Sequence, residues 1–365
     1  MRRPWLFCKH PAGLPRRDVL FSAHGLLVAL CILLGSVGAT NAASAATPAE
    51  TFRATDHLPT VPVGESHYLD VAAFLARYNL SGEWIEPGKR QRFASAWTTI
   101  VLEVDSREIE FNGLRLFMGL GTVVREGRIW IDRIDAEKLL APLLRPATYA
   151  DSLRPVKRIV IDAGHGGKDG GTAHKTFKLQ EKTFALDVAK RLKALLTAQG
   201  FEVVMTREDD TYIGLAERAL IGQQAKADLF VSVHFNAAGR ESVRGTETYI
   251  CTPQHQRSTS SDKDDPSDHT HELGNGSDPW NAVLGYQMHR SLQGQIGSVD
   301  RGLKRARFAV LRLAKCPAVL VESAYLTNDA EARRIASPEF RAEIARAIAN
   351  GVVAYANLVL STQSS

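Results

Sequence analysis

Cysteine is scarce in this chain, with four residues among 365, and two of them, Cys8 and Cys31, lie in an N-terminal segment that we expect to be removed. The remaining pair, Cys251 and Cys316, is too small for a disulfide framework, and neither belongs to a C-x-x-C motif. The count also excludes a metal site built from cysteine ligands. Because Cys316 precedes an apolar segment, we expect it to be an inert core thiol.

Excess positive charge is missing from the body of the chain. The formal net charge is +5, but residues 1–45 carry five bases and one acid, a net of +4, which leaves +1 for residues 46–365. No basic stripe interleaved with aromatic residues occurs there, so nucleic acid is not an expected partner. The sequence also lacks a G-x-S-x-G nucleophile elbow, and Ser-His-Asp hydrolysis therefore has no support.

The first 45 residues have the three parts of an export signal. Arg16-Arg17 precedes an apolar run, 19–37, and a small-residue stretch with an A-x-A site, 43–45, follows. The arginine pair resembles a twin-arginine signal. An uncleaved anchor is the alternative, since the run is almost long enough to span a bilayer. We expect cleavage, because the small-residue stretch follows the apolar run. We then expect no permanent membrane span, because no later segment is apolar enough to cross a membrane. The predicted location is the periplasm or cell envelope.

Residues 46–63 are predicted to be a linker and 64–148 a small α+β domain. The predicted helices cover 68–75 and 135–143, and the predicted strands cover 99–104, 108–111, 114–118 and 128–131. Asn112-Gly113 is a hairpin signal between two of these strands. The order of elements resembles the small N-terminal domain of copper amine oxidases. We expect a binding, anchoring or regulatory module, and a packing domain without a ligand is the alternative.

Residues 156–360 alternate between apolar strands and amphipathic helices. This alternation predicts the α/β class, with a mostly parallel twisted sheet and helices on both faces. The predicted strands cover 156–162, 201–205, 228–234, 308–311 and 318–322, and the predicted helices cover 179–198, 213–225, 280–296 and 342–358. A polar insertion at about 252–279 has no periodicity, so we expect it to be exposed and mobile. It is too polar to predict an amphipathic blocking helix.

Residues with catalytic or metal-binding chemistry lie at the ends of the predicted strands. His165 follows the first strand, His234 closes the third, Glu322 closes another, and Glu181 opens the first helix. Because ligands bind beyond the carboxyl ends of parallel strands, we expect these side chains to converge. Two imidazoles and a carboxylate form a catalytic zinc set, and a further carboxylate would serve as base. Each residue alone has a structural explanation, but four converging groups are hard to assign to packing.

Over its last 200 residues the chain resembles the zinc-dependent N-acetylmuramoyl-L-alanine amidases of the amidase-3 type, which cleave peptidoglycan. The matching segments are Ile161–Asp169, Gln180–Lys182, Thr206–Asp209, Leu215–Arg218, Ser232–Ala237, Gly245–Tyr249, Asp300–Lys304 and Val321–Asn328. The resemblance implies one zinc ion per catalytic domain, held by His165, Glu181 and His234, with Glu322 as catalytic carboxylate. It implies structural or substrate-orienting roles for Arg207, Arg218 and Asn236.

By this resemblance the protein hydrolyses the amide bond between N-acetylmuramic acid and L-alanine, for cell-wall remodelling or daughter-cell separation. Peptidoglycan is then the substrate, and an activator or divisome-type protein is a further partner to consider. Two alternatives remain open from the sequence. One is another exported zinc peptidase that acts on wall peptides, and the other is a non-catalytic wall-binding protein.

Overall fold

The computed structural model describes residues 55–363, so the predicted leader and the first half of the predicted linker lie outside the described residues. The strands are β1 (Thr60–Val63), β2 (Ser66–Asp70), β3 (Ser81–Glu86), β4 (Arg90–Ala94), β5 (Thr99–Glu103), β6 (Glu108–Phe111), β7 (Leu114–Phe117), β8 (Val123–Arg125), β9 (Arg128–Asp132), β10 (Arg158–Ala163), β11 (Ala173–His174), β12 (Leu179–Gln180), β13 (Glu202–Met205), β14 (Leu229–Asn236), β15 (Thr246–Cys251), β16 (Asp300–Ala306) and β17 (Ala318–Tyr325). The α-helices are α1 (Val71–Ala76), α2 (Arg133–Asp135), α3 (Ala141–Leu144), α4 (Glu181–Ala198), α5 (Leu215–Gln224), α6 (Asp278–Ile296), α7 (Ala309–Arg312), α8 (Asp329–Ala336) and α9 (Pro338–Gln363).

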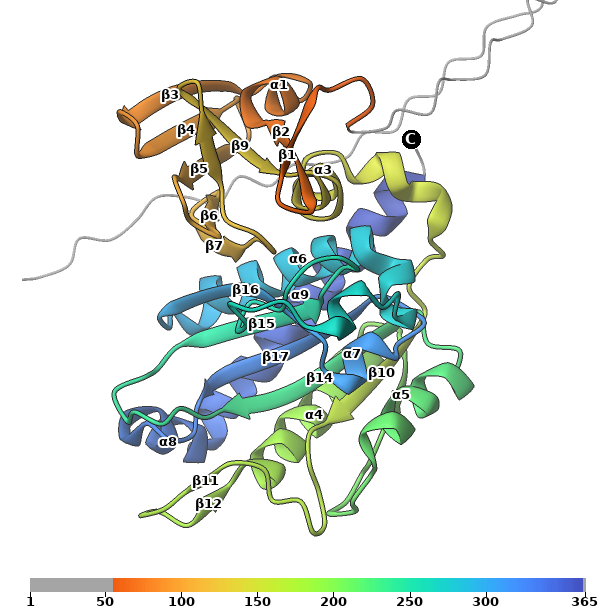
Figure 1. The fold of residues 1–365 in the computed structure, drawn as a ribbon. Coiled ribbons are helices and arrows are strands. Elements are labelled where there is room, and N and C mark those ends of the chain that lie inside the picture. Colours follow the sequence, from red (N-terminus) through yellow and green to blue (C-terminus); the bar gives the residue numbers. More distant parts are fainter. Residues whose placement is uncertain (1–54, 364–365) are drawn as a thin grey trace, which may run out of the picture. The chain divides into compact units, whose positions relative to one another are not determined.

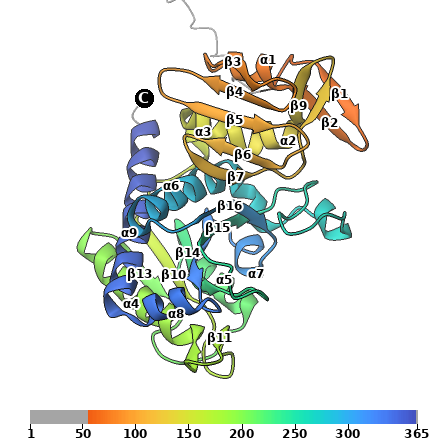
Figure 2. The same cartoon turned by 90° about the vertical axis from the view of Figure 1, so that its left-hand side faces the viewer.

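The C-terminal part contains the predicted alternation of buried strands and helices. Strands β13, β10, β14 and β17 lie side by side and run parallel, β15 is antiparallel to β17, and β16 is parallel to β15. Helices α4, α6 and α9 pack together on one face of these strands, and α5 and α7 pack together on the other (Figures 1 and 2). The predicted α/β class with flanking helices is therefore confirmed. The predicted strand at 308–311 is wrong, because this short apolar run forms α7, and such runs do not distinguish a strand from a helical turn.

The sheet as a whole is mixed. The predicted mostly parallel arrangement describes the strands that 156–360 contributes to this sheet, where only the pairing of β15 with β17 is antiparallel, but it does not extend to the N-terminal strands. Five N-terminal strands, antiparallel to one another, extend the sheet to eleven, in the order β13-β10-β14-β17-β15-β16-β7-β6-β5-β4-β3. The join is between β7 and β16, where Leu116 pairs with Leu303 and both side chains are buried. Pairing between strands so distant in sequence leaves no local pattern, so the sequence did not reveal it.

The N-terminal region is rich in strands, and it also contains a second sheet with the order β1-β2-β9-β8. The predicted hairpin between β6 and β7 is present, since Asn112 and Gly113 have φ values of 50° and 79°, which a tight Asn-Gly turn requires. The first helix begins at Val71 and not at residue 68, because Asp70 caps it by accepting a hydrogen bond from the backbone N–H of Ala72.

The regions predicted as two domains belong to one compact unit in the part of the chain that the structure describes. A single cluster of buried apolar side chains includes residues of both regions, from Leu69 in the first to Val359 in the second. A buried ion pair also crosses the predicted boundary, with Arg305 Nη1 of β16 2.6 Å from Asp135 Oδ1, and these side chains are 1% and 0% exposed. That either region folds alone stays a prediction.

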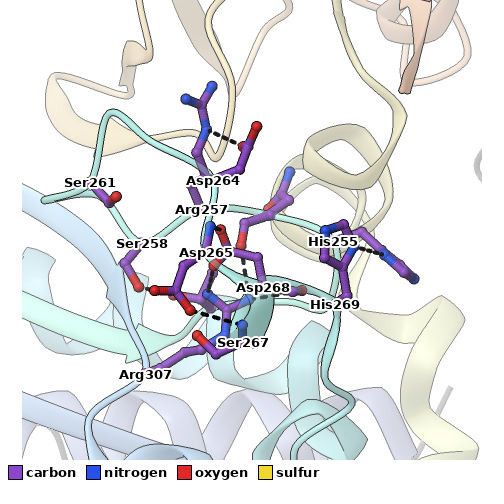
Figure 3. Close-up of polar contacts among 12 residues, drawn as sticks. His255, Arg257, Ser258, Ser261, Asp264, Asp265, Ser267, Asp268, His269 and Arg307 are labelled. Atoms are coloured by element: carbon purple, nitrogen blue, oxygen red, sulfur yellow. Dashed lines mark hydrogen bonds and ion pairs between the residues drawn. The ribbon is translucent and has the colours of Figure 1, made fainter. Parts of the chain in front are cut away.

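The polar insertion at 252–279 is exposed over its middle, as expected at 262–267, but it is anchored by contacts near both ends. Its mobility stays a prediction. Its regular elements are short 3₁₀ helices at Pro266–His269 and Leu273–Ser277, before α6 begins. Arg107, in the loop after β5, donates hydrogen bonds to the backbone carbonyls of Arg257, Ser258 and Ser261. Figure 3 shows Arg307 directed at the insertion, where its Nη1 lies 2.5 Å from Asp268 Oδ1. Arginines outside the insertion therefore bind its backbone carbonyls and the carboxylate of Asp268, which its composition alone does not predict.

Helix α9 is long and apolar enough, by length and composition, to cross a membrane, which corrects the expectation that no segment after the leader is. However, 56% of its most apolar window is buried within the structure, against α4 and α6 among other elements. Such burial is typical of the core helix of a globular fold.

The two cysteines of the described chain are free. Cys251 is buried, and burial raises the pKa of its thiol to about 12. Burial likewise raises the pKa of Cys316 to about 12. Because the thiolate is the reactive form, Cys316 fits the inert role predicted for it, and the raised pKa makes Cys251 unreactive too.

We expect Asp135→Ala to destabilise the protein strongly. The change leaves the Arg305 guanidinium buried without its carboxylate, and breaking a buried pair in this way costs about 3–5 kcal/mol. Denaturant titration would measure the free energy of unfolding. As a control, Glu86→Ala breaks an exposed pair with Lys89 and should change that free energy by less than about 1 kcal/mol. Equal losses in the two variants would contradict the assignment.

Candidate active site

The four residues singled out from the sequence meet at one edge of the sheet. His165 follows β10, Glu181 is the first residue of α4, His234 lies near the end of β14, and Glu322 lies in β17. In the parallel register of β14 and β17, His234 pairs with Glu322. All four line one cavity of about 340 Å³. The convergence expected from parallel strand ends is therefore present.

Glu181 lies between the two imidazoles. Its Oε2 is 3.1 Å from His165 Nε2, and its Oε1 is 2.9 Å from His234 Nδ1. One ligand atom from each residue lies within 4.8 Å of those of the other two, a spacing that suits a single metal ion. The donor set of two imidazoles and one carboxylate is typical of catalytic zinc sites.

The backbone around these ligands is shaped to make room for them. A Cβ at Gly164 would lie 2.3 Å from His234 Cε1, and one at Gly171 would lie 2.6 Å from both Glu181 Oε2 and His165 Cδ2. His165 itself has a φ of 59°, in the left-handed region that residues with a Cβ rarely adopt. Strain of this kind is held where the surrounding structure fixes it, which is common at functional sites.

A neighbouring carboxylate orients His165. Asp169 Oδ2 lies 2.8 Å from His165 Nδ1, so the other ring nitrogen, Nε2, faces Glu181. Such a partner fixes the tautomer and the ring plane of a metal-binding histidine. Burial lowers the pKa of His165, but hydrogen bonds and charge from Glu181 and Asp169 outweigh it and raise the pKa above its ordinary value.

The two glutamates of the site have opposite electrostatics. Burial raises the pKa of Glu181, but hydrogen bonds from His165 and His234 and their charge outweigh this and hold the pKa well below its ordinary value. Burial and the negative charges of Glu181 and Glu247 raise the pKa of Glu322 well above its ordinary value. Glu322 Oε2 is also buried and has no hydrogen-bond partner among the described residues. Glu181 is thus suited to bind a cation, and Glu322 to accept and return a proton.

Arg207 and Arg218 hold the loop that carries His165. Arg207 donates to the backbone carbonyls of Ala163 and Gly164, and Arg218 donates to those of Ala163 and His165. Both side chains are buried, which favours the structural alternative for them. Arg218 also pairs with the fully buried Asp162 at 2.8 Å.

Asn236 lines the cavity, and its amide is fixed on both sides. Its Nδ2 donates to Glu247 Oε2 at 3.1 Å, and its Oδ1 accepts from the backbone N–H of Ala237. Sequence reasoning missed Glu247 as a site residue. The Gly245–Tyr249 segment was among those that resemble the amidase family, but the contact of Glu247 with Asn236 depends on how β14 and β15 are placed in the fold.

A three-ligand site with a separate bare carboxylate, at the carboxyl edge of an α/β sheet, defines the chain as a candidate metal-dependent hydrolase. The family model for N-acetylmuramoyl-L-alanine amidase, Amidase_3, matches residues 159–354. The chain belongs to this family.

Individual amidases are also similar in sequence to this chain. The chain is 36% identical over 197 residues to N-acetylmuramoyl-L-alanine amidase LytC of Bacillus subtilis, covering 54% of this chain and 35% of that protein. It is 33% identical over 233 residues to amidase AmiC of Neisseria meningitidis, covering 58% of this chain and 55% of that protein. The catalytic domain of the amidase CwlV from Bacillus (Paenibacillus) polymyxa is similar at 33% identity, covering 55% of this chain and 98% of that one, with a TM-score of 0.47. The chain thus spans about a third to a half of the length of the first two relatives.

Two substitutions should separate the roles of the glutamates. Glu181→Ala removes a negative ligand from a three-ligand set and should lower metal occupancy and activity together. Glu322→Gln keeps the size of the side chain but cannot accept a proton, so metal content should stay near one ion per chain while turnover falls by roughly two or more orders of magnitude. Emission spectroscopy and a muropeptide-release assay measure both quantities. Metal loss in the Glu322 variant, or metal retention in the Glu181 variant, would reverse the roles.

A single added methyl group should also disable the site. The Cβ in Gly164→Ala would force His234 aside, so we expect metal affinity and activity to fall by about tenfold or more while the fold is kept. Isothermal titration with zinc would measure the affinity. Gly239→Ala is the matched control, because a Cβ there meets no atom within 4 Å. Unchanged zinc binding in the Gly164 variant would show that the ring of His234 can move without consequence.

Proposed function

We propose that this chain is a zinc-dependent N-acetylmuramoyl-L-alanine amidase that hydrolyses the amide bond between N-acetylmuramic acid and L-alanine in peptidoglycan. The observation that carries the proposal is the bare Glu322 carboxylate beside the His165-Glu181-His234 set, in a chain of this family. Peptidoglycan as substrate, and activity of the whole protein, follow from family membership and are part of the proposal.

His165, Glu181 and His234 would hold one zinc ion, and the glycine cradle around them fits such a group. When bound, the ion supplies a Lewis acid that polarises the amide carbonyl and lowers the pKa of water. The depressed pKa of Glu181 keeps its carboxylate charged for this purpose. Asp169 keeps His165 turned toward the site.

Glu322 then performs the proton transfers. Its Oε2 accepts a proton from the attacking water as the water oxygen adds to the amide carbon. As the C–N bond breaks, Glu322 returns that proton to the leaving nitrogen, giving a carboxylic acid on the lactyl group and a free amine on L-alanine. The raised pKa of Glu322 suits a group that must hold the proton between these two steps.

The substrate lies outside the cytoplasmic membrane, so the function requires export. The leader predicted at 1–45 supports this, with the periplasm or cell envelope as the location. An activator or divisome-type partner would serve to restrict the enzyme to sites of wall cleavage.

Digestion of purified sacculi tests the reaction. Residues 46–365 loaded with zinc should release stem peptides that begin with L-alanine and should leave the glycan strands intact, as mass spectrometry would show. Glu322→Gln, equally loaded, should release almost none. Shortened stem peptides would instead identify an exported zinc peptidase, and binding without release would identify a wall-binding protein.

A further inference from the structure

The sheet face that carries Glu322 continues beyond the cavity onto β15 and β16 (Figure 1). Glu247 of β15 lies opposite Glu322 in the antiparallel register, so both side chains project from the same face. Tyr249, two residues further along β15, projects from that face too. Its ring lies 5.1 Å from that of Phe308, which lines the cavity. The cavity and this part of the sheet therefore form one continuous surface.

Glu247 holds two cations in fixed positions on this surface. Its buried carboxylate accepts hydrogen bonds from Arg301 Nε (2.8 Å), Lys304 Nζ (2.8 Å), Tyr249 OH (2.5 Å), Tyr325 OH (2.5 Å) and Asn236 Nδ2 (3.1 Å). Burial raises the pKa of Glu247, but Lys304 and the hydrogen bonds outweigh this and lower it to about 2, so the group stays charged. One carboxylate thus faces two cations, and the cluster has one positive charge in excess.

Arg301 is positioned with donors to spare. It bonds Glu247 through Nε and also interacts with the Tyr325 hydroxyl, and 34% of the side chain is exposed, so other Nη donors remain for a ligand. The guanidinium lies 5.3 Å from the centre of the Tyr325 ring. Gly245 makes room for this conformation, because a Cβ there would lie 2.8 Å from Arg301 Cγ. A planar guanidinium fixed in this way is suited to bind a carboxylate through two parallel hydrogen bonds.

Asp300, the acidic residue that precedes Arg301, has other hydrogen-bond partners. Asp300 accepts instead from His289 Nε2 and from the backbone N–H groups of Arg115 and Gly302. The excess cationic character therefore remains available to a ligand.

The N-terminal region forms the far wall of this surface. Phe117 of β7 packs over Gly302, where a Cβ would lie 2.6 Å from its ring. Lys304 Nζ lies 5.5 Å from the centre of the Phe117 ring and 5.9 Å from that of Tyr249. Two aromatic rings thus confine the ammonium group, and one of them belongs to a strand outside the segment that matches the amidase family.

We propose that Arg301 and Lys304 form a subsite for a free carboxylate of the peptidoglycan stem peptide, which rests on the proposed function. From β17 through β15 to β16 is about 10 Å, at about 4.8 Å per strand. Each stem residue spans about 3.5 Å, so the subsite lies within reach of the second or third residue. The second residue is D-glutamate linked through its side chain, and its α-carboxyl group is either free or amidated. The subsite selects the free form.

Two small substrates test this without any mutation. N-acetylmuramoyl-L-alanyl-D-isoglutamate carries the free carboxylate, and the D-isoglutamine compound carries an amide in its place. The zinc-loaded wild-type protein should cleave the first with a kcat/KM about tenfold higher, as expected for a charge-assisted hydrogen bond. Equal values would overturn the subsite. Cleavage of neither compound nor of sacculi would instead refute the proposed function.

Variants locate the selectivity. Arg301→Gln should lower kcat/KM for the isoglutamate substrate about tenfold and narrow its ratio to the isoglutamine substrate toward one, and Arg301→Lys should keep part of that ratio. Phe117→Ala should reduce the ratio at least threefold, because Lys304 loses one wall. Arg92→Gln is the matched control, since Arg92 is an exposed arginine of β4 that pairs with Glu83. If Arg301→Gln keeps the wild-type ratio of kcat/KM between the two substrates, Arg301 does not bind the carboxylate. If Phe117→Ala keeps that ratio, β7 has no part in the subsite.

Discussion

The geometry of the site depends on one buried ion pair beneath it, between Asp162 at the end of β10 and Arg218 of α5. Asp162 is fully buried, and its carboxylate also accepts hydrogen bonds from Thr206, directly after β13, and from Ser232, within β14. Arg218 reaches past Asp162 to the carbonyl of His165. A buried pair adds little net stability over apolar packing, so we attribute its value to position. It holds three neighbouring strands and the left-handed turn at His165 in one arrangement.

The opposed glutamates on β15 and β17 show how neighbouring groups of the same type acquire different chemistry. Glu247 is saturated by five donors and remains an anion, whereas Glu322 has a buried oxygen without a partner and a raised pKa. Glu247 binds Arg301 and Lys304, and its negative charge contributes to the raised pKa of Glu322. One anion therefore holds two cations in place and also favours the protonated form of the proposed base.

The parts of the site that follow from parallel strand ends could be predicted from sequence. His165, His234 and Glu322 each stand at the end of an apolar run, and such ends share an edge, so their convergence needed no coordinates. Glu247 could not be recognised in this way, because its importance comes from an antiparallel strand inserted beside β17 and from donors on three other segments. The anchoring of 252–279 was missed for a similar reason. Arg107 donates a hydrogen bond to a backbone carbonyl of this segment and Arg307 pairs with its Asp268, and both arginines lie outside the segment in the sequence.

The N-terminal strands cover a sheet edge that would otherwise be open beside the candidate active site. Without β7, strand β16 would present an unpaired edge next to Arg301 and Lys304, and open edges invite pairing with other chains. Adding five strands moves that edge to β3, which carries Glu83 and Glu86 and an irregular register near Trp84. Charge and irregularity both discourage edge pairing. The same addition places Phe117 against Lys304, so the covering of an edge and the completion of a surface near the site result from one strand pairing.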